Sequence, residues 1–493
     1  MANIENSDFL IYDLETFDIR PKYTCVSQFA ARRYSSDFEP IDDGTILYCK
    51  LPEDHMPSLE ACILTGITPQ FANEHGDNEL EFARKAKSVL MTKPGKTIIS
   101  GYNNTTFDNW VMNFLFFRNL MQPYEPFRNR SLDCFTITKA VHHMSRDSLK
   151  YVQVAKDDGT MRDSLKLEHL SRANSLTHTK AHDALSDVEA TAGLFSLIKK
   201  SCDGIFAKYL SYSRKDNPAR FLESSAKSKM PVMIVTRSPR DNSDFTTLAM
   251  ILGSDANSFY AFDLLCNDKA FEENLAKLGE AQKSSECDYV GSMFKFCHTI
   301  KANEGPYADY PENYFKENGD EGERKLLQSR LEKLNSVRTA EYTPINSFRG
   351  KKAAASGKND ETSDSGKPLL VEETLLDGFL NNEAGELMDI AENGNVSDIE
   401  RALRNLKNKN YSMRVKTLFT HMVARNFPEL YSQKTLAKWH EQVKTRLMEQ
   451  KDAFVADYNR LIKSDISPEK KQILKEVADY EEGIFDKFSL RLF

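Results

Sequence analysis

The sequence predicts a chain of three parts: an α/β domain, then a smaller β-rich domain, then a helical domain. Three observations lead to this prediction. Strand-like and helix-like segments share the first 200 residues, strand-like runs gather between residues 230 and 265, and helical patterning continues from residue 372 onwards. At 493 residues, the chain also has room for about three domains of ordinary size.

The first part, residues 1–201, begins with strands and ends with a helix. Four runs rich in apolar or β-branched side chains predict strands, at residues 9–12, 25–33, 45–51 and 97–101. The first three are separated by short turns, which indicates a meander. Four longer segments predict helices, at residues 79–91, about 108–120, 133–143 and 184–198. The last of these has apolar residues at spacings of three and four, so we expect it to pack on the sheet.

The second and third parts are marked by changes of pattern. In residues 202–348, three runs look like antiparallel strands, at 231–236, 247–252 and 258–264. Residues 349–368 are rich in Ser, Gly, Lys and acidic residues, which predicts a flexible connector. Residues 369–493 predict a helical domain, with a capping box formed by Ser397 and Glu400. Ser467 before Pro468 predicts the N-cap of a further helix.

Composition describes a globular protein, with 40% hydrophobic and 28% charged residues. No run of eighteen apolar residues appears, and Glu5 and Asp8 stand where a signal peptide would be basic and then apolar. We therefore expect a cytoplasmic protein without a membrane span. The eight cysteines form no CxxC pair, so we expect buried thiols. The net charge of −7 argues against nucleic-acid binding, although an acidic total can hide a basic groove.

The candidate chemistry starts at residues 9–16, FLIYDLET. On a strand, residues i and i+2 point to one face, so Asp13 and Glu15 present two neighbouring carboxylates. Such a pair is costly unless a cation neutralises it, and Mg²⁺ is commonly held by one or two carboxylates. Taken alone, however, a D-x-E pair occurs by chance in most chains of this length.

Two later stretches add to this pair. Residues 101–108, GYNNTTFD, run from a strand to a helix start and place Asp108 where helical N–H groups favour a carboxylate. Residues 181–188, AHDALSDV, place His182 just before a helix and Asp187 in its first turns. Singly, Asp108 is read best as a helix cap and His182 as a surface residue. Together, the four acids and one histidine form a candidate metal-dependent site.

In this order, D-x-E-T on a first strand, an Asp after N-N-x-x-F and H-x(4)-D before a last helix resemble the DEDDh family of 3′-to-5′ exonucleases, which has an RNase H-like fold. Four further runs resemble the bacterial exonuclease I family within it: residues 64–69 (LTGITP), 101–104 (GYNN), 167–170 (LEHL) and 181–184 (AHDA). That family has an exonuclease domain, an SH3-like domain and a helical domain, to which residues 424–428 (ARNFP) are similar. The resemblance therefore implies an SH3-like fold for residues 202–348.

The resemblance implies a two-metal-ion hydrolysis of the phosphodiester bond. Asp13 would be shared by two Mg²⁺ ions, for which Mn²⁺ could substitute, and Glu15 and Asp187 would complete the ion that carries the attacking water. Asp108 would hold the second ion. His182 would take the proton from the water, a role that suits a side chain with an ordinary pKa of about 6.5.

The resemblance also implies contacts with a single strand, in which cations meet phosphates and flat side chains stack on bases. Lys166 matches a cationic position of the family and is a candidate phosphate contact. Phe17, Tyr102, Phe107 and Trp110 are candidates for stacking, and Glu15 also borders the substrate. Arg425 could lie on a groove of the helical domain. The alternative for the aromatic residues is the core, and for Arg425 it is a structural role at a helix end.

The implied function is the digestion of single-stranded DNA to 5′-mononucleotides in DNA repair and recombination. The two added domains predict processive digestion by enclosing the strand. Two alternatives remain open: an exoribonuclease that trims RNA 3′ ends, and a nonenzymatic scaffold that binds single strands. The resemblance also implies a partner, the single-stranded DNA-binding protein, through its C-terminal tail. We expect a monomer.

Overall fold

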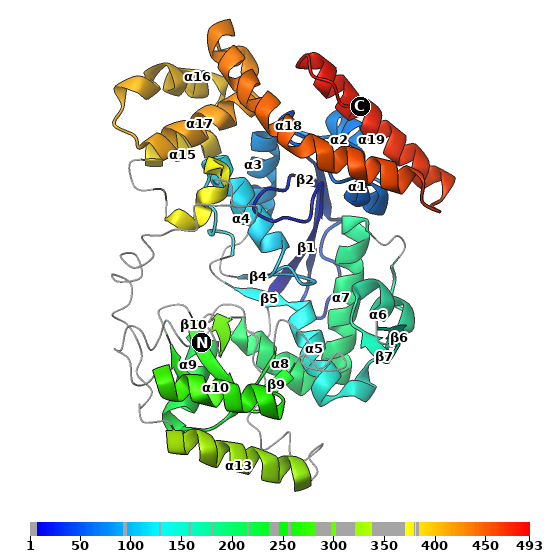
Figure 1. Ribbon diagram of the computed structural model, residues 1–493, viewed down its shortest axis with the longest axis vertical. Coiled ribbons are helices and arrows are strands. Elements are labelled where there is room, and N and C mark those ends of the chain that lie inside the picture. The colour runs from blue at the N-terminus through cyan, green and yellow to red at the C-terminus, as the bar shows by residue number, and fades with distance from the viewer. Residues whose placement is uncertain are drawn as a thin grey trace.

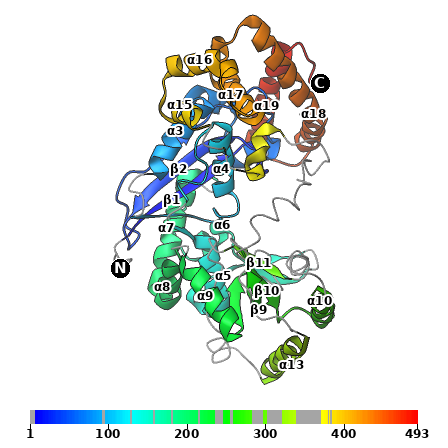
Figure 2. The same ribbon diagram turned by 90° about the vertical axis from the view of Figure 1, so that its left-hand side faces the viewer.

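The computed structural model describes residues 7–91, 96–127, 130–156, 159–178, 182–213, 216–235, 246–254, 258–281, 297–301, 321–337, 370–378, 380 and 384–493. The α/β part lies in the middle of the molecule, with the β-rich part at one end and the helical part at the other (Figure 1). The second view shows the same order along the long axis (Figure 2). The helices of the described segments are all too short or too polar to cross a membrane.

A five-stranded sheet organises the first part, in the order β3-β2-β1-β4-β5. Its strands are β1 (Asp8–Thr16), β2 (Val26–Tyr34), β3 (Thr45–Tyr48), β4 (Thr97–Gly101) and β5 (Ser131–Asp133). β1, β2 and β3 form an antiparallel meander, whereas β4 and β5 run parallel to β1. The predicted meander and the strand at residues 97–101 are thus confirmed. β1 is the central strand, because it pairs with both β2 and β4.

Alternate residues of β1 pack into different layers, as the pleat of a strand requires. Phe9 and Ile11 belong to the apolar cluster that contains the buried side chains of α5 and α7. Leu10, Tyr12 and Leu14 point to the other face, where they meet α3 and α4. The helices of this part are α1 (Leu59–Thr65), α2 (Pro69–His75), α3 (Glu79–Leu90), α4 (Asp108–Arg118), α5 (Cys134–Met144), α6 (Leu167–Ala173) and α7 (Ala184–Ser201). Buried on both faces, β1 is a rigid base for the residues at its end.

A second sheet forms the middle part, as the sequence predicts. Its four antiparallel strands lie in the order β11-β10-β9-β8. They are β8 (Val232–Val235), β9 (Thr246–Ser254), β10 (Ser258–Asp263) and β11 (His298–Lys301), with α10 (Asp268–Ala281) and α13 (Glu321–Val337) packed on one face. The other face shares an apolar cluster with α7, α8 (Asp203–Tyr212) and α9 (Asp216–Ser228). The hydrophobic core therefore runs without a break across residues 201 and 202.

A hairpin and a short 3₁₀ turn complete the first part. β6 (Val152–Ala155) and β7 (Met161–Ser164) form an antiparallel hairpin before α6. A single 3₁₀ turn, η2 (Arg146–Ser148), follows α5.

The SH3-like character of the middle part stays a prediction. The predicted connector at residues 349–368 lies outside the described residues.

The C-terminal part is helical, as predicted. It contains η3 (Val371–Asp377), α15 (Gly385–Asn393), α16 (Val396–Asn405), η5 (Leu406–Asn408), α17 (Met413–Asn426), η6 (Pro428–Leu430), α18 (Gln433–Ile462) and α19 (Pro468–Lys487). Ser467 caps α19 and Pro468 is its first residue, which confirms that prediction. The predicted capping box of Ser397 and Glu400 is wrong. Asn395 is the N-cap of α16 and exchanges hydrogen bonds with Asp398, because the helix begins two residues earlier than the Ser397 pattern indicated.

The helical part is packed directly onto the first part. The antiparallel pair α18 and α19 lies beside α1 and α2 (Figure 1). One apolar cluster joins Phe17 and Leu59 to Val443 and Val477 of this pair. A second cluster joins residues of α3 and α4 to α15 and α17. The first and third parts are therefore built around shared cores.

Candidate active site

The site is built on the carboxyl end of β1. Asp13 and Glu15 occupy alternate positions after Ile11 and so point to the face covered by α5 and α7. Asp13 is half-buried, whereas Glu15 is 8% exposed. β1 and β2 stay paired through Glu15, with a register shift directly after it. The sheet thus holds both carboxylates in place on an element that cannot easily move.

Asp108 is brought to β1 by the loop that follows β4. At Gly101, a Cβ atom would come within 2.7 Å of the Tyr12 carbonyl oxygen, so only glycine allows the two strands to approach this closely. Asp133 then accepts hydrogen bonds from the backbone N–H groups of Asn103 and Thr105, at 3.0 and 3.2 Å. The side chain of Asp133 on β5 therefore holds the loop in place. It ends at Asp108, the first residue of α4, which is 5% exposed.

His182 and Asp187 approach from the start of α7. Asp183 is the N-cap of this helix, and its side chain accepts a hydrogen bond from the Ser186 N–H. The Ala184 N–H donates to Gln28 on β2 at 3.1 Å, which fixes the helix start to the sheet. His182 adopts the left-handed conformation, with φ at 62°. As a result, donor atoms of Glu15, His182 and Asp187 all lie within 4.8 Å of one another.

The pKa values of the acids show that their negative charges lie close together. Burial raises the pKa of Asp13 well above its usual range, and the charges of Asp108, Asp187 and Glu15 raise it further. Burial also raises the pKa of Asp108 to about 7, although hydrogen bonds from backbone groups of Asp108 and Leu14 oppose this. Burial and mutual repulsion thus both disfavour the ionised form of Asp13, and a bound cation would offset them.

The donor set fits hard divalent cations. The carboxylates of Asp13, Glu15, Asp108 and Asp187 come from three separate elements, and they would supply oxygen ligands of the kind that such ions prefer. The electrostatic repulsion between them is the physical reason to expect a cation there. His182 stands at the edge of this set with a ring nitrogen that can accept a proton.

Comparison with known proteins decides the family. A family model described as Exonuclease matches residues 10–195, and another, described as Exonuclease I C-terminal domain, matches residues 370–484. Exodeoxyribonuclease I of Haemophilus influenzae is 27% identical to this chain over 97% of its length and 98% of that protein. The chain belongs to the exonuclease I family. The predicted membership, the exonuclease activity class and the RNase H-like fold of the first part are thereby confirmed.

Other members of the exonuclease I family agree. Exodeoxyribonuclease I of Escherichia coli is 37% identical over 43% of this chain and 44% of that protein. A zinc-bound complex of E. coli exonuclease I with single-stranded DNA has a TM-score of 0.76 at 25% identity, covering 97% of this chain and 99% of that one. For exonuclease I from Methylocaldum szegediense the TM-score is 0.77 at 24% identity, with the same coverage of 97% and 99%. The arrangement of the three parts is thus shared with solved exonuclease I structures.

The side chains predicted to contact the substrate differ in their exposure. Lys166 is the N-cap residue of α6, and its side chain is exposed to solvent, where it is accessible to a phosphate group. Tyr102 and Phe107 are half-buried beside the site, and the Tyr102 hydroxyl donates a hydrogen bond to the Leu165 carbonyl oxygen. Trp110 is half-buried and packs beside Phe114, with ring centroids 6.4 Å apart. Roles for these residues in substrate binding stay predictions.

The side chain of Phe17 is too deeply buried to stack on a base, so that prediction is wrong. It is 1% exposed and belongs to the apolar cluster shared with α18 and α19. The reason is that the helical part covers the position directly after the catalytic strand. A core role, the alternative that the sequence left open, is the one that Phe17 plays.

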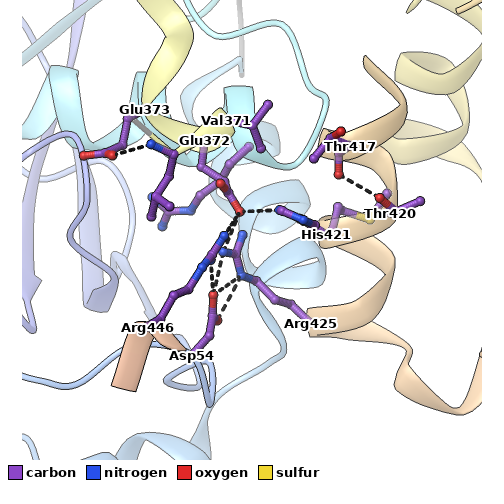
Figure 3. Close-up of polar contacts among 12 residues, drawn as sticks. Asp54, Val371, Glu372, Glu373, Thr417, Thr420, His421, Arg425 and Arg446 are labelled. Carbon is purple, nitrogen blue, oxygen red and sulfur yellow. Dashed lines mark hydrogen bonds and ion pairs between the residues drawn. The ribbon is translucent and has the colours of Figure 1, made fainter. Parts of the chain in front are cut away.

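Arg425 makes shielded ion pairs and also lines a pocket between the first part and the helices α17, α18 and α19. Its role as a substrate contact stays a prediction. Its guanidinium donates to both carboxylate oxygens of Asp54 and, at 2.7 Å, to Glu372 (Figure 3). Arg446 donates to the same two acids, and His421 donates to Glu372 at 2.9 Å. We call these five residues the Asp54–Glu372 cluster. It joins the first part, through Asp54, to η3, α17 and α18.

His178 is a residue of the site that the sequence reasoning missed. Its Nε2 atom donates to Asp187 Oδ1 at 2.6 Å, and its side chain is only 7% exposed. Burial raises the pKa of Asp187, and this hydrogen bond acts in the opposite direction. The only signal in the sequence is its position in residues 176–183, LTHTKAHD, four residues before His182. Nothing in that spacing distinguishes it from an ordinary loop histidine.

Proposed function

We propose that this chain is a 3′-to-5′ exodeoxyribonuclease that degrades single-stranded DNA to 5′-mononucleotides with two Mg²⁺ ions. The observation that supports it most is that donor atoms of Glu15, His182 and Asp187 lie within 4.8 Å of one another at the end of β1. The charges of Asp13 and Asp108 also act within this group. Related solved structures, which include a complex of E. coli exonuclease I with single-stranded DNA, support the choice of substrate. Mn²⁺ is expected to substitute for Mg²⁺.

Each site residue has a role in this proposal. When bound, the ions would polarise the scissile phosphate and activate the attacking water. Asp13 would be the ligand shared by both ions, since its carboxylate lies within electrostatic reach of the other three acids. Glu15 and Asp187 would hold the ion on the side of the water, and Asp108 the other. His182, beside Glu15 and Asp187, would accept the proton that the water loses.

Several further roles stay predictions. They are binding to single-stranded DNA-binding protein through its C-terminal tail, a function in DNA repair, a monomeric state and a cytoplasmic location. A solved structure of SSB with an exonuclease I that is 24% identical to this chain supports the first of these predictions. An exoribonuclease would use the same metal site, because the carboxylates contact the phosphate and not the sugar. The assay must therefore contain RNA.

The proposal is tested with 5′-labelled oligonucleotides of matched sequence as single-stranded DNA, duplex DNA and RNA. We expect Mg²⁺-dependent shortening of the single-stranded DNA from its 3′ end, loss of this activity in EDTA, and much slower shortening of the RNA. Asp13→Ala is the control for host nuclease, and it should abolish digestion while strand binding survives. Equal rates on RNA and DNA, or retained turnover in Asp13→Ala, would overturn the proposal.

A further inference from the structure

We propose that His178 is a positioning residue of the metal site: it holds one oxygen of Asp187 so that the other oxygen stays directed at the ion. This inference rests on the proposed function only in taking Asp187 as a metal ligand. It gives His178 a role separate from that of His182.

The His178–Asp187 contact has a defined direction. An ionised carboxylate can only accept, so the Nε2 atom of His178 carries the proton and donates it to Oδ1 at 2.6 Å. A ring nitrogen occupied in this way cannot also take a proton from an attacking water. His178 therefore differs from His182, although both lie next to Asp187.

Both partners are held by surrounding structure. The side chains of His178 and Asp187 are 7% and 15% exposed, so the hydrogen bond is largely shielded from water. Asp187 lies in the first turn of α7, where its N–H donates to the Asp183 carbonyl oxygen at 3.0 Å. His178 comes from the segment after α6, which Leu176 anchors by packing beside Gly193 of α7. The bond is thus a tertiary contact that restrains the Asp187 side chain, together with a hydrogen bond from the His182 backbone.

Asp187 needs such a partner more than an ordinary surface acid does. Its neighbours in the site include Glu15 and Asp13, whose negative charges push its carboxylate away. Hydrogen bonds that orient a metal-binding side chain are a general feature of metal sites, and their loss typically weakens metal affinity about 10- to 100-fold. The hydrogen bond from His178 counteracts that repulsion and restrains the Asp187 carboxylate.

The pair His142–Asp163 offers a matched control. His142 Nε2 lies 2.8 Å from Asp163 Oδ2, and both side chains are nearly buried, at 11% and 6% exposure. Asp163, however, also accepts hydrogen bonds from Arg146 and Gln153, so its negative charge is balanced locally. This pair has the same geometry without a cluster of acids around it. Its removal should change stability and leave the metal site as it is.

The test measures Mn²⁺ binding by calorimetry on the full chain, without DNA. His178→Leu should raise the Kd for Mn²⁺ about 10- to 100-fold. His178→Gln, whose amide nitrogen can stand near the position of Nε2, should recover most of the affinity. His142→Leu should leave the Kd unchanged. In the nuclease assay, the loss in His178→Leu should be largely restored by raising the Mg²⁺ concentration, whereas His182→Ala should not be rescued in this way.

An unchanged Kd in folded His178→Leu would overturn the inference, as would a Kd in His178→Gln as poor as in the leucine variant. If the leucine variant does not fold, His178→Asn replaces it, because the shorter amide cannot reach Asp187. Failure of the proposed function is distinguishable, since the binding experiment contains no DNA. A chain that does not digest single-stranded DNA but loses Mn²⁺ affinity in His178→Leu would contradict the function and support the role of His178.

Discussion

Asp108 illustrates how single residues acquire their properties at this site. It is 5% exposed, and burial raises its pKa to about 7. Two donors from the backbone favour its ionised form, but they do not offset the cost of removing the charge from water. An ion bound between Asp108 and its neighbours would supply the missing stabilisation, because a cation favours the charged form of every carboxylate around it.

The proposed role of His182 as the general base leads to a prediction about turnover. We expect His182→Ala to lower kcat on single-stranded DNA by about 10²- to 10⁴-fold, the usual contribution of a general base, and to leave KM nearly unchanged. The reason is that its ring accepts a proton and is not needed to hold the strand. Single-turnover digestion of a 5′-labelled oligonucleotide measures the effect. The matched control is His142→Ala, because His142 lies outside the site. Normal turnover in His182→Ala would show that His182 is not the general base.

Individual helices depend on side chains at their ends and in their packed faces. α16 begins after Asn395, whose side chain accepts hydrogen bonds from the N–H groups of Ser397 and Asp398. Asp398 in turn accepts from the Asn395 N–H, so two groups at the helix start are satisfied reciprocally. On α19, Glu481 is 1% exposed and sits in the contact with α1. Both features lead to predictions that a stability measurement can check.

For α16, we expect Asn395→Ala to lower the free energy of unfolding by about 1 kcal/mol, because two backbone donors lose their partner. Ser397→Ala should change it by less than about 0.5 kcal/mol, as for most surface substitutions. Chemical denaturation of both variants measures the difference. A larger loss for Ser397→Ala than for Asn395→Ala would mean that the helix starts where the sequence pattern first indicated.

For α19, burial raises the pKa of Glu481 from 4.5 to about 8. Between these values the unfolded chain releases the proton and the folded chain keeps it, so stability falls as the pH rises from about 4.5 to 8. Glu481→Gln removes this dependence. We expect the variant and the parent to have similar Tm values at pH 5. At pH 8 the variant should be more stable by on the order of 3 kcal/mol.

The control for this experiment is Glu482→Gln, on the exposed side of the same helix. It should follow the pH dependence of the parent. If Glu481→Gln and the parent lose stability in parallel between pH 5 and pH 8, the carboxyl group of Glu481 is ionised in the folded protein.

In the whole molecule, the helical part is joined to the first part by shared apolar cores and by the Asp54–Glu372 cluster. Burial alone would raise the pKa of Asp54, yet Arg425 and Arg446 hold it below its usual range. The same two arginines and His421 hold the pKa of Glu372 well below its usual range. The centroid of the Trp439 ring lies 5.6 Å from the guanidinium carbon of Arg425 and 5.4 Å from that of Arg446. Both cations therefore also contact an aromatic face.

We therefore expect Arg425→Ala to lower the free energy of unfolding by about 3 to 5 kcal/mol, since it leaves buried carboxylates with one cation fewer. Arg401→Ala is the control, because the Arg401–Asp398 pair on α16 is exposed and should contribute less than about 0.5 kcal/mol. Chemical denaturation and limited proteolysis near residue 54 measure the two effects. Equal, small losses in both variants would show that the cluster does not hold the two parts together.

The shared cores also change how processivity should be tested. Deleting residues 369–493 would uncover Phe17 and Leu59, which pack against α18 and α19. The remaining chain would then expose a large apolar surface. Run length per binding event is better compared between the parent and Arg425→Ala, in which the helical part is loosened but present. Shorter runs in the variant would support a role of this part in enclosing the strand.

The amino-acid sequence by itself predicted the order of the three parts and the main strands and helices of the first part, and it named five candidate site residues. Alternating apolar residues fix which face of β1 carries Asp13 and Glu15, and this local pattern can be read without a structure. The capping of α16 was misplaced, because Asn395 and Ser397 are both good caps and the sequence alone does not rank them. Local rules thus predicted elements well and their ends less well.

Only the tertiary structure decided which polar and aromatic side chains face solvent and which are buried. Arg425 and Asp54 are 371 residues apart, and Phe17 is covered by helices more than 400 residues later, so no local pattern could assign either one to the interior. His178 became part of the site because α6 and α7 bring it against Asp187. The physical reason is the same in each case: burial and hydrogen bonding are set by packing between distant segments, which sequence spacing does not encode.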